Sequence, residues 1–377
     1  MSKDISVEQL SALKKLSTRF SDLPDIRQKG KVRHPLGEVL TIGFCSMMCG
    51  FDHFTEMELF AKSQEGWLGQ FLELRDGPPS HDTFRNVFSG INPDAFSEVL
   101  AQWSGRPVVS DGHLAIDGKA ICGTGVHLVR AWADSLGISI GQVACAEKSN
   151  EIEAIPRLLD KLVLDGAAVS IDAIGCQTEI ASKIDDGGGF YLLALKKNQA
   201  ETHSAVSKHF ESGGGGACAR TEEFSRGRHE VRICTVEEDL SFLGKSWKWQ
   251  GLTCVVRVRT EICRHGGRGT DMSESTCEDR YYLCSLPEGR RQAQDLLALA
   301  RAHWSVENRC HWMLDVVFGE DACPVRDKVA ARNLSTMRGI VLAILREDSG
   351  KGSLRSKRQR AALDPAFRSK IISMLHA

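Results

Sequence analysis

The stretch from Arg301 to Asp315 decides how the chain is interpreted, and it runs Arg-Ala-His-Trp-Ser-Val-Glu-Asn-Arg-Cys-His-Trp-Met-Leu-Asp. Apolar residues recur at helical spacing from Leu296 through Cys310 to Val317, which predicts one long amphipathic helix. Glu307 lies close to the apolar stripe of this helix. A carboxylate in such a place is costly unless it is paired, protonated or bound to a cation. The rest of the sequence should therefore contain the groups that Glu307 meets.

The composition indicates a globular protein without a membrane anchor. The chain has 377 residues, of which 42% are hydrophobic and 26% are charged, and this length allows two or three domains with a sizeable core. No apolar run reaches the roughly 18 residues of a membrane span. The polar start Met1-Ser2-Lys3-Asp4 is unlike a secretory signal, so we expect a cytoplasmic protein.

Net charge and cysteine usage narrow the possible functions. The net charge of -1 argues against a protein that coats nucleic acid, so any DNA contact must come from local basic patches. The 13 cysteines are odd in number and include no C-x-x-C pair, which argues against a disulfide framework and a standard zinc site. Most of them are expected to be small buried apolar residues in a reducing compartment.

The order of the predicted elements indicates an α/β fold. Residues 1–105 contain short helical segments separated by turns, and Ser80 is the expected N-cap of one of them. In residues 106–199 we predict five strands and two helices. The strands are expected at 113–117, 127–134, 137–146, 167–171 and 190–195, one helix at 151–164 between the third and fourth strands, and the other at 176–184 before the fifth. This is the order of a ribonuclease-H-like mixed sheet, which a last catalytic helix should complete.

That last helix is delayed in the sequence. Residues 200–289 intervene, and strand-like segments at 231–236, 252–262 and 281–286 predict a β-rich insertion. Residues 290–350 then supply the Glu307 helix and a second helix. Residues 351–377 form a basic tail with seven Lys or Arg and one acid, a local net charge of +6. Such a tail is most often a flexible solvated end, but it is also a place where a near-neutral protein binds phosphate.

Three carboxylates are candidates for chemistry. Asp117 and Asp172 each follow an apolar strand segment, and Glu307 lies on an apolar helix. Converging on one edge, they would repel one another strongly without cations. Oxygen ligands select Mg²⁺ or Mn²⁺, and two such ions about 3.5–4 Å apart activate an attacking hydroxyl and stabilise a leaving oxygen. We therefore expect all three acids to bind metal, with Asp117 bridging two ions.

Other interpretations of these residues stay open at this point. An aspartate at a strand end is more often a turn or cap residue than a ligand. Glu307 beside Arg301 and His303 fits a plain ion pair. His303, Glu307, His311 and Asp315 also recur at i, i+4 spacing, as zinc ligands do, although the face has no H-E-x-x-H pattern.

Several longer motifs resemble a known family. They are Leu114-Ala115-Ile116-Asp117-Gly118-Lys119, Ile171-Asp172-Ala173-Ile174-Gly175, Leu193-Ala194-Leu195-Lys196-Lys197-Asn198-Gln199 and His303-Trp304-Ser305-Val306-Glu307-Asn308. The set resembles the DDE transposases of bacterial insertion sequences, and more narrowly their ISAs-type or H-repeat-associated branch. Residues 79–84 resemble the amino-terminal associated domain of that family. The resemblance extends from about residue 20 to residue 346.

The resemblance implies an enzyme. It implies Mg²⁺-dependent cleavage at the ends of a mobile element, with Mn²⁺ as a substitute, and transfer of the 3′-OH into target DNA. By position, Asp117, Asp172 and Glu307 match the catalytic, metal-binding acids of the family. Double-stranded DNA is the implied partner, a homodimer the implied assembly on paired ends, and a bacterial cytoplasm, at the nucleoid, the implied location.

The resemblance also suggests DNA contacts, and the sequence departs from the family at some of them. The expected contacts are Lys119, Lys196, Asn198, Gln199, Arg301, His303 and Asn308. For Asn198 and Gln199, hydrogen bonding within the loop is an equally good interpretation. The family usually has Arg where this chain has Cys122. The broader group places Tyr, Arg and Lys around its catalytic Glu, where this chain has Ala300, His303 and Leu314.

Two other functions fit the same sequence. One is an inactive or domesticated DNA-binding relative that keeps the fold, and the other is a metal-dependent nuclease outside transposition. Fold alone does not choose among them, because function resides in the site. Inverted repeats flanking the gene would favour transposition.

Overall fold

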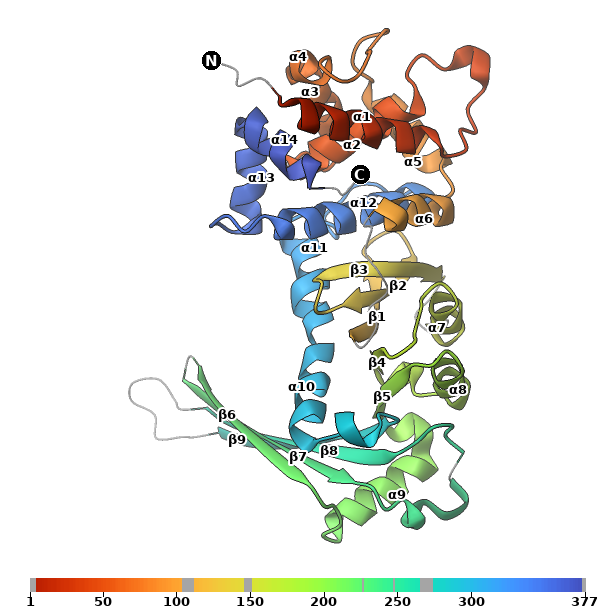
Figure 1. Ribbon diagram of the computed structural model, residues 1–377, viewed down its shortest axis with the longest axis vertical. Helices are drawn as coiled ribbons and strands as arrows, with labels where there is room; N and C mark the ends of the chain where they lie inside the picture. Colours follow the sequence, from red (N-terminus) through yellow and green to blue (C-terminus); the bar gives the residue numbers. More distant parts are fainter. Residues whose placement is uncertain are drawn as a thin grey trace.

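The computed structural model describes residues 5–103, 112–145, 151–225, 227–246, 248–264 and 274–374. Three tiers follow one another along the longest axis: helices from both ends of the chain, then the core strands with their helices, then the insertion strands (Figure 1). The fold is α/β with a mixed sheet, as predicted, and the core and insertion strands form one sheet of nine strands. Among the described helices, none is both long and apolar enough to cross a membrane.

The N-terminal tier is helical, as predicted. Its helices are α1 (Val7–Ser21), α2 (Leu36–Met48), α3 (Phe54–Ser63), α4 (Glu65–Leu68), α5 (His81–Gly90) and α6 (Pro93–Trp103). Every residue of α2 is buried, because α1, α3, α5 and the later helix α12 pack around it. The Ser80 side chain accepts a hydrogen bond from the Thr83 amide, so the predicted N-cap of α5 is confirmed.

The core sheet follows the predicted order of elements. Its strands are β1 (His113–Ile121), β2 (Val126–Ala133), β3 (Ile138–Cys145), β4 (Ala168–Ile171) and β5 (Phe190–Leu195), and its helices are α7 (Glu151–Leu159) and α8 (Thr178–Asp186). β1 pairs antiparallel with β2 and parallel with β4, and β4 pairs parallel with β5. β1 runs beyond its predicted end at Asp117, which therefore lies within the strand, opposite Arg130 of β2.

The insertion continues the core sheet. Its strands are β6 (Cys218–Ser225), β7 (Arg228–Glu237), β8 (Cys254–Arg264) and β9 (Glu274–Cys284), and β9 pairs antiparallel with β5. The full order is β3-β2-β1-β4-β5-β9-β8-β7-β6. The sequence did not predict β6 or the helix α9 (Ala200–Glu211), because β6 is an edge strand whose largely exposed residues show no clear apolar alternation.

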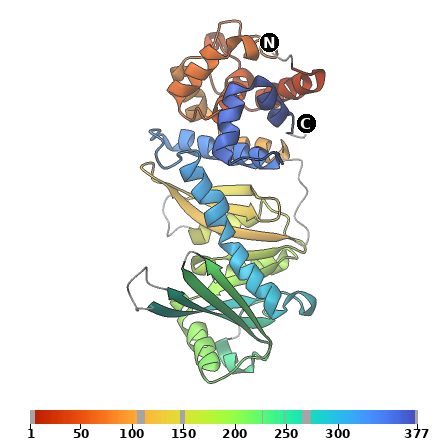
Figure 2. The same cartoon turned by 90° about the vertical axis from the view of Figure 1, so that its left-hand side faces the viewer.

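The Glu307 element is helical but is interrupted by a wider turn. It comprises α10 (Ala293–His303), the π-helical turn η7 (Val306–His311) and α11 (Trp312–Val316). In Figures 1 and 2 this element runs along the sheet from the insertion toward the N-terminal helices. The prediction of one uniform helix is therefore wrong at residues 306–311, where Trp312 donates its amide to the Glu307 carbonyl. Such turns occur often at functional sites.

The C-terminal residues are packed helices, and the expectation of a flexible end is wrong. After α12 (Lys328–Glu347), the helices α13 (Leu354–Leu363) and α14 (Pro365–Ser373) pack with α1 and α2. Lys357, Arg358 and Arg368 of the predicted basic tail are buried. Arg358 bonds Asp52 at 2.5 Å, a contact between residues 306 positions apart that the local charge pattern cannot reveal.

Candidate active site

The three candidate acids come from three elements that meet on one face of the sheet. Side chains alternate along β1, so Leu114 and Ile116 pack in the cluster that holds α7 and α8, whereas Ala115 faces the opposite way. Asp117 has the same parity as Ala115 and lies toward η7, which carries Glu307. Asp172 directly follows β4 and shares its parity with Ser170, which contacts His303 of α10.

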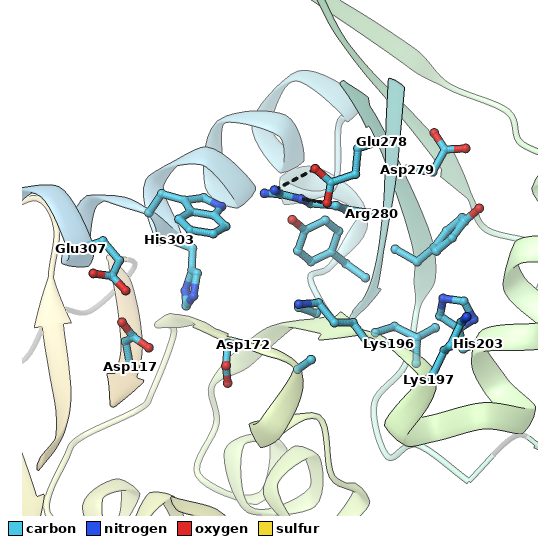
Figure 3. Close-up of a pocket in the computed structure, with 16 residues that line it drawn as sticks. Asp117, Asp172, Lys196, Lys197, His203, Glu278, Asp279, Arg280, His303 and Glu307 are labelled. Carbon is cyan, nitrogen blue, oxygen red and sulfur yellow. Dashed lines mark hydrogen bonds and ion pairs between the residues drawn. The ribbon is translucent and has the colours of Figure 1, made fainter. Parts of the chain in front are cut away.

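Asp117, Asp172 and Glu307 all line a cavity of about 530 Å³. Figure 3 shows Glu307 and Asp117 directed toward each other, with His303 between them and Asp172. The opposite wall consists of Lys196 and Lys197 after β5 and residues 278–282 of β9. The insertion therefore forms part of the cavity, because β9 is hydrogen-bonded directly to β5.

A compact donor cluster comprises Asp117, Glu307 and His311. Their ligand atoms all lie within 4.8 Å of one another. His311 Nδ1 is 3.5 Å from Asp117 Oδ2 and 3.6 Å from Glu307 Oε2. Asp172 is outside this cluster, and its Oδ1 accepts the Ile174 amide at 3.2 Å as the cap of a short 3₁₀ turn. The structure thus brings two of the three acids together and places the third in the same cavity.

The cluster has more negative charge than the protein neutralises. Burial, and next the charge of Glu307, raises the pKa of Asp117 to about 7. The nearby His311 ring, whose Nδ1 is 3.6 Å from Oε2, holds the pKa of the more exposed Glu307 below its usual value. Burial lowers the pKa of His311, which favours the neutral imidazole. Among the described residues, no Lys or Arg forms an ion pair with Asp117 or Glu307, so the donor set fits a divalent cation.

His303 is held by a hydrogen-bonded chain that ends inside the sheet. Its Nδ1 lies 2.8 Å from Ser170 Oγ, which lies 2.7 Å from Nε2 of His113. Burial lowers the pKa of His303, and burial together with His303 lowers the pKa of His113 to about 4. Since Nδ1 is engaged and the residue lines the cavity, Nε2 is the atom that His303 can present to a ligand.

The predicted DNA contacts fall into two groups. Lys196 lines the cavity and, like its neighbour Lys197, has no ion-pair partner among the described residues. The others have partners within the chain. Lys119 pairs with Asp315 and Glu320, Arg301 pairs with Glu223, Asn198 donates to the Ala173 carbonyl, Gln199 donates to the Cys176 carbonyl, and Asn308 donates to the Trp304 carbonyl. The bonds of Asn198 and Gln199 tie their loop to the turn after Asp172, and their contact with DNA stays a prediction.

A second charged cluster, centred on Glu320, contains both acidic and basic side chains. Glu320 is 0% exposed and contacts Lys119 at 3.1 Å, Ser335 at 2.5 Å and Arg130 at 3.7 Å. Burial alone would raise the pKa of Glu320, but the charges of Arg130 and Lys119 outweigh burial and lower this pKa to about 2. This cluster anchors the segment after α11 to β1 and β2.

Sequence reasoning missed four residues of the cavity region. Lys197, Arg280 and Trp304 line the cavity, and the Arg280 guanidinium lies 5.0 Å from the centre of the Trp304 ring. Nothing local marks Arg280, because its place depends on β9 joining β5. His311 is marked in the sequence by its i, i+4 spacing from Glu307, a spacing that there suggests only a zinc site.

Comparison with known proteins agrees with this geometry. The family model described as "Transposase DDE domain" matches residues 113–344, and the one described as "DDE_Tnp_1-associated" matches residues 17–104. The chain is 34% identical to "Putative transposase YncI" of Escherichia coli O157:H7, over 96% of this chain and 95% of that protein. It is 33% identical to "H repeat-associated putative transposase YhhI" of Escherichia coli K12, over 96% of this chain and 98% of that protein.

A shorter relative bears a different name. "Inactive transposase YbfQ" of Escherichia coli K12 is 35% identical over 77 residues, which are 20% of this chain and 92% of that protein. The longer matches cover the elements that carry Asp117, Asp172 and Glu307. The chain therefore belongs to the DDE transposase family, with the associated N-terminal domain and the H-repeat-associated relatives that its motifs indicated.

Proposed function

We propose that this chain is an active transposase that cuts DNA at the ends of a mobile element and joins the freed 3′-OH to target DNA. One observation carries the proposal: Asp117 and Glu307, 190 residues apart in sequence, meet in a cavity where no lysine or arginine of the described chain neutralises them. An arrangement that leaves two adjacent carboxylates unpaired is costly unless a cation joins them. A DNA substrate brings phosphate oxygens that complete the shell of such a cation.

Asp117, Asp172 and Glu307 are the proposed metal ligands, for Mg²⁺ or Mn²⁺ and for two ions in the reacting complex. Bound divalent cations would supply Lewis-acid charge for an in-line displacement at phosphorus. Asp117 is the acid whose pKa is raised, besides burial, by the charges of both Glu307 and Asp172, and it would therefore be the ligand shared by two ions. Asp172 has one oxygen, Oδ2, without a hydrogen bond from the described residues, and this oxygen is available to a ligand in the cavity.

The walls of the cavity suit a DNA strand. Lys196 and Lys197 present two cations without protein partners on the side opposite Glu307, and phosphates are their natural ligands. Trp304 also lines the cavity and is 48% exposed, so the part of its ring that Arg280 does not cover can contact a base or sugar. The helical N-terminal domain is the proposed reader of the element ends, and pairing two ends implies an assembly of at least two subunits.

A DNA-binding relative without catalytic activity is the main alternative. The relative named inactive supports it only weakly, because it covers 20% of this chain. The present chain retains all three acids at one cavity. A metal-dependent nuclease would use the same residues, so only the choice of DNA substrate separates a nuclease from a transposase.

The test is cleavage and strand transfer on the DNA that flanks the gene, with Mg²⁺, with EDTA, and with the Glu307→Gln variant. We expect cuts at both flanks that require metal and Glu307, while Glu307→Gln keeps its fold and its DNA affinity. Binding without cuts would identify the inactive relative. Metal-dependent cuts without regard to the flanks would identify a nuclease.

A further inference from the structure

We infer that His311 is a direct ligand of the cation that Asp117 and Glu307 hold, so that the centre has one nitrogen and two carboxylate donors. The consequence is a preference for first-row transition ions such as Mn²⁺ over Mg²⁺. The inference rests on the proposed metal centre and adds a ligand and a selectivity that the three acids alone do not imply.

The distances permit one ion to contact all three side chains. Two ligand atoms that each lie about 2.1 Å from one ion are at most about 4.2 Å apart. His311 Nδ1 is within that limit of both carboxylates, at 3.5 Å from Asp117 and 3.6 Å from Glu307. The three atoms lie within 4.8 Å of one another, and the Glu307 side chain is 53% exposed and free to adjust.

The environment of His311 supports a role as ligand. The residue is 3% exposed, and its Nδ1 is directed at the two carboxylates. Its Nε2 has no hydrogen-bond partner among the described residues. The ring is therefore held by the packing of its neighbours and by the contacts of Nδ1. Here the one nitrogen with close polar neighbours is the one that faces the candidate ligands.

Helical spacing explains how two ligands come from one short segment. Val306 and Cys310 are four residues apart and pack in the hydrophobic core, while Glu307 and His311, also four residues apart, face β1. Residues four apart lie on the same side of a helix, so the apolar pair and the polar pair occupy adjacent sides of one segment. Rigid placement of His311 therefore comes from the core packing of its neighbours.

A nitrogen donor changes which ions bind well. Mg²⁺ strongly prefers oxygen ligands, whereas imidazole suits transition ions. Replacing one oxygen position by His311 therefore weakens Mg²⁺ relative to Mn²⁺. The i, i+4 pair of Glu307 and His311 that suggested zinc in the sequence thus has a metal-binding explanation in which Asp117 of β1 is the third ligand.

The test is pulsed electron paramagnetic resonance of the full-length protein with MnCl₂, which detects nitrogen bound to Mn²⁺ directly. We expect a ¹⁴N coupling in the wild type that changes to the ¹⁵N pattern when histidine is ¹⁵N-labelled. His311→Asn places an amide oxygen near the position of Nδ1, so the coupling should vanish. The Mn²⁺ affinity should then fall by at least about tenfold, with little change for Mg²⁺.

His303→Gln is the matched control. His303 also lines the cavity, but its Nδ1 is engaged by Ser170. The ¹⁴N coupling should persist in this variant, and its loss there with retention in His311→Asn would overturn the assignment in favour of His303. Circular dichroism checks the fold of each variant, and His311→Gln replaces His311→Asn if the latter does not fold.

The outcomes separate this inference from the proposed function. Mn²⁺ that binds through Asp117 and Glu307 without any histidine coupling in the wild type would refute the role of His311 and leave the metal centre intact. Mn²⁺ that does not bind, or binds equally well to Asp117→Asn, would refute the centre itself. The wild-type measurement decides the point even if every His311 variant fails to fold.

Discussion

Asp117 lies partly buried on β1 and Glu320 lies fully buried against β1 and β2, and the protein treats their charges in opposite ways. Glu320 is 0% exposed, yet it contacts Lys119, Arg130 and Arg338, and its pKa falls to about 2 because these charges outweigh its burial. Asp117 has Glu307 as its charged neighbour, and burial followed by that repulsion raises its pKa to about 7. Lys119, two residues after Asp117, contacts Glu320.

The two carboxylates differ in whether the protein itself supplies the opposite charge. The Glu320 cluster is balanced by the chain itself and holds the fold together. The Asp117 cluster is left unbalanced, and an external cation removes the repulsion. Buried charge that no residue of the described chain neutralises therefore locates the functional site better than buried charge in general. The predictions below test this contrast.

The largest effect is expected at Glu320. Glu320→Gln removes the carboxylate next to the buried Arg130 and Arg338 guanidinium groups, so the free energy of unfolding should fall by about 3–5 kcal/mol. Urea denaturation measures this change. The control is Asp321→Asn, since Asp321 lies 3.5 Å from Lys119 but its side chain is 45% exposed. A loss below about 1 kcal/mol for Glu320→Gln would show that the Glu320 ion pairs contribute little to the stability of the fold.

Metal addition should stabilise the Asp117 cluster and leave the Glu320 cluster unchanged. At a concentration about 100-fold above its dissociation constant, a cation that binds only the folded state adds about 2.7 kcal/mol to the free energy of unfolding. We expect this gain from Mn²⁺ in the wild type, measured by urea denaturation before and after EDTA. The gain should be lost in Asp117→Asn, and an equal gain in that variant would place the bound ion elsewhere.

Without metal, Asp117→Asn should stabilise the protein. A carboxyl whose pKa is raised on folding contributes stability below its unfolded pKa, and this contribution is lost as pH rises through the folded value of about 7. In EDTA at pH 8 the variant should therefore exceed the wild type by about 1–3 kcal/mol, and the difference should shrink toward pH 5. A variant less stable than the wild type at pH 8 would contradict the assignment of unbalanced charge.

Basic residues also differ in whether the protein supplies a partner of opposite charge, and here we expect the smallest change in stability. Lys196 and Lys197 have no ion-pair partners in the described chain, whereas Arg358 is buried against Asp52. Replacing both lysines by alanine should leave stability unchanged and reduce the slope of log affinity for DNA against log salt by about 2. Fluorescence anisotropy across a salt series measures the slope. Arg358→Ala should instead destabilise the fold, and a slope unaffected by the lysine pair would remove them from the DNA path.

The sequence alone determined the order of the core elements, the helical N-terminal region and the three acids. These depend on short-range patterns: short apolar strand segments that lead into Asp117 and Asp172, helical periodicity around Glu307, and the cap at Ser80. The spacing also contained the pairing of Glu307 with His311, because both lie on one helical segment. The motifs indicate the family because they contain these local patterns in the same order along the chain.

Only the tertiary structure decided which charges are balanced and which are open. Lys119 meets Glu320 across 201 positions of sequence, and Arg358 meets Asp52 across 306. The insertion strands extend the core sheet through β5 and β9, which puts Arg280 into the cavity wall. A basic run of sequence therefore became helices with buried cations, while the carboxylate of Asp117 has no Lys or Arg partner among the described residues. The sequence gives the charge of each residue, but long-range packing determines which residues it contacts.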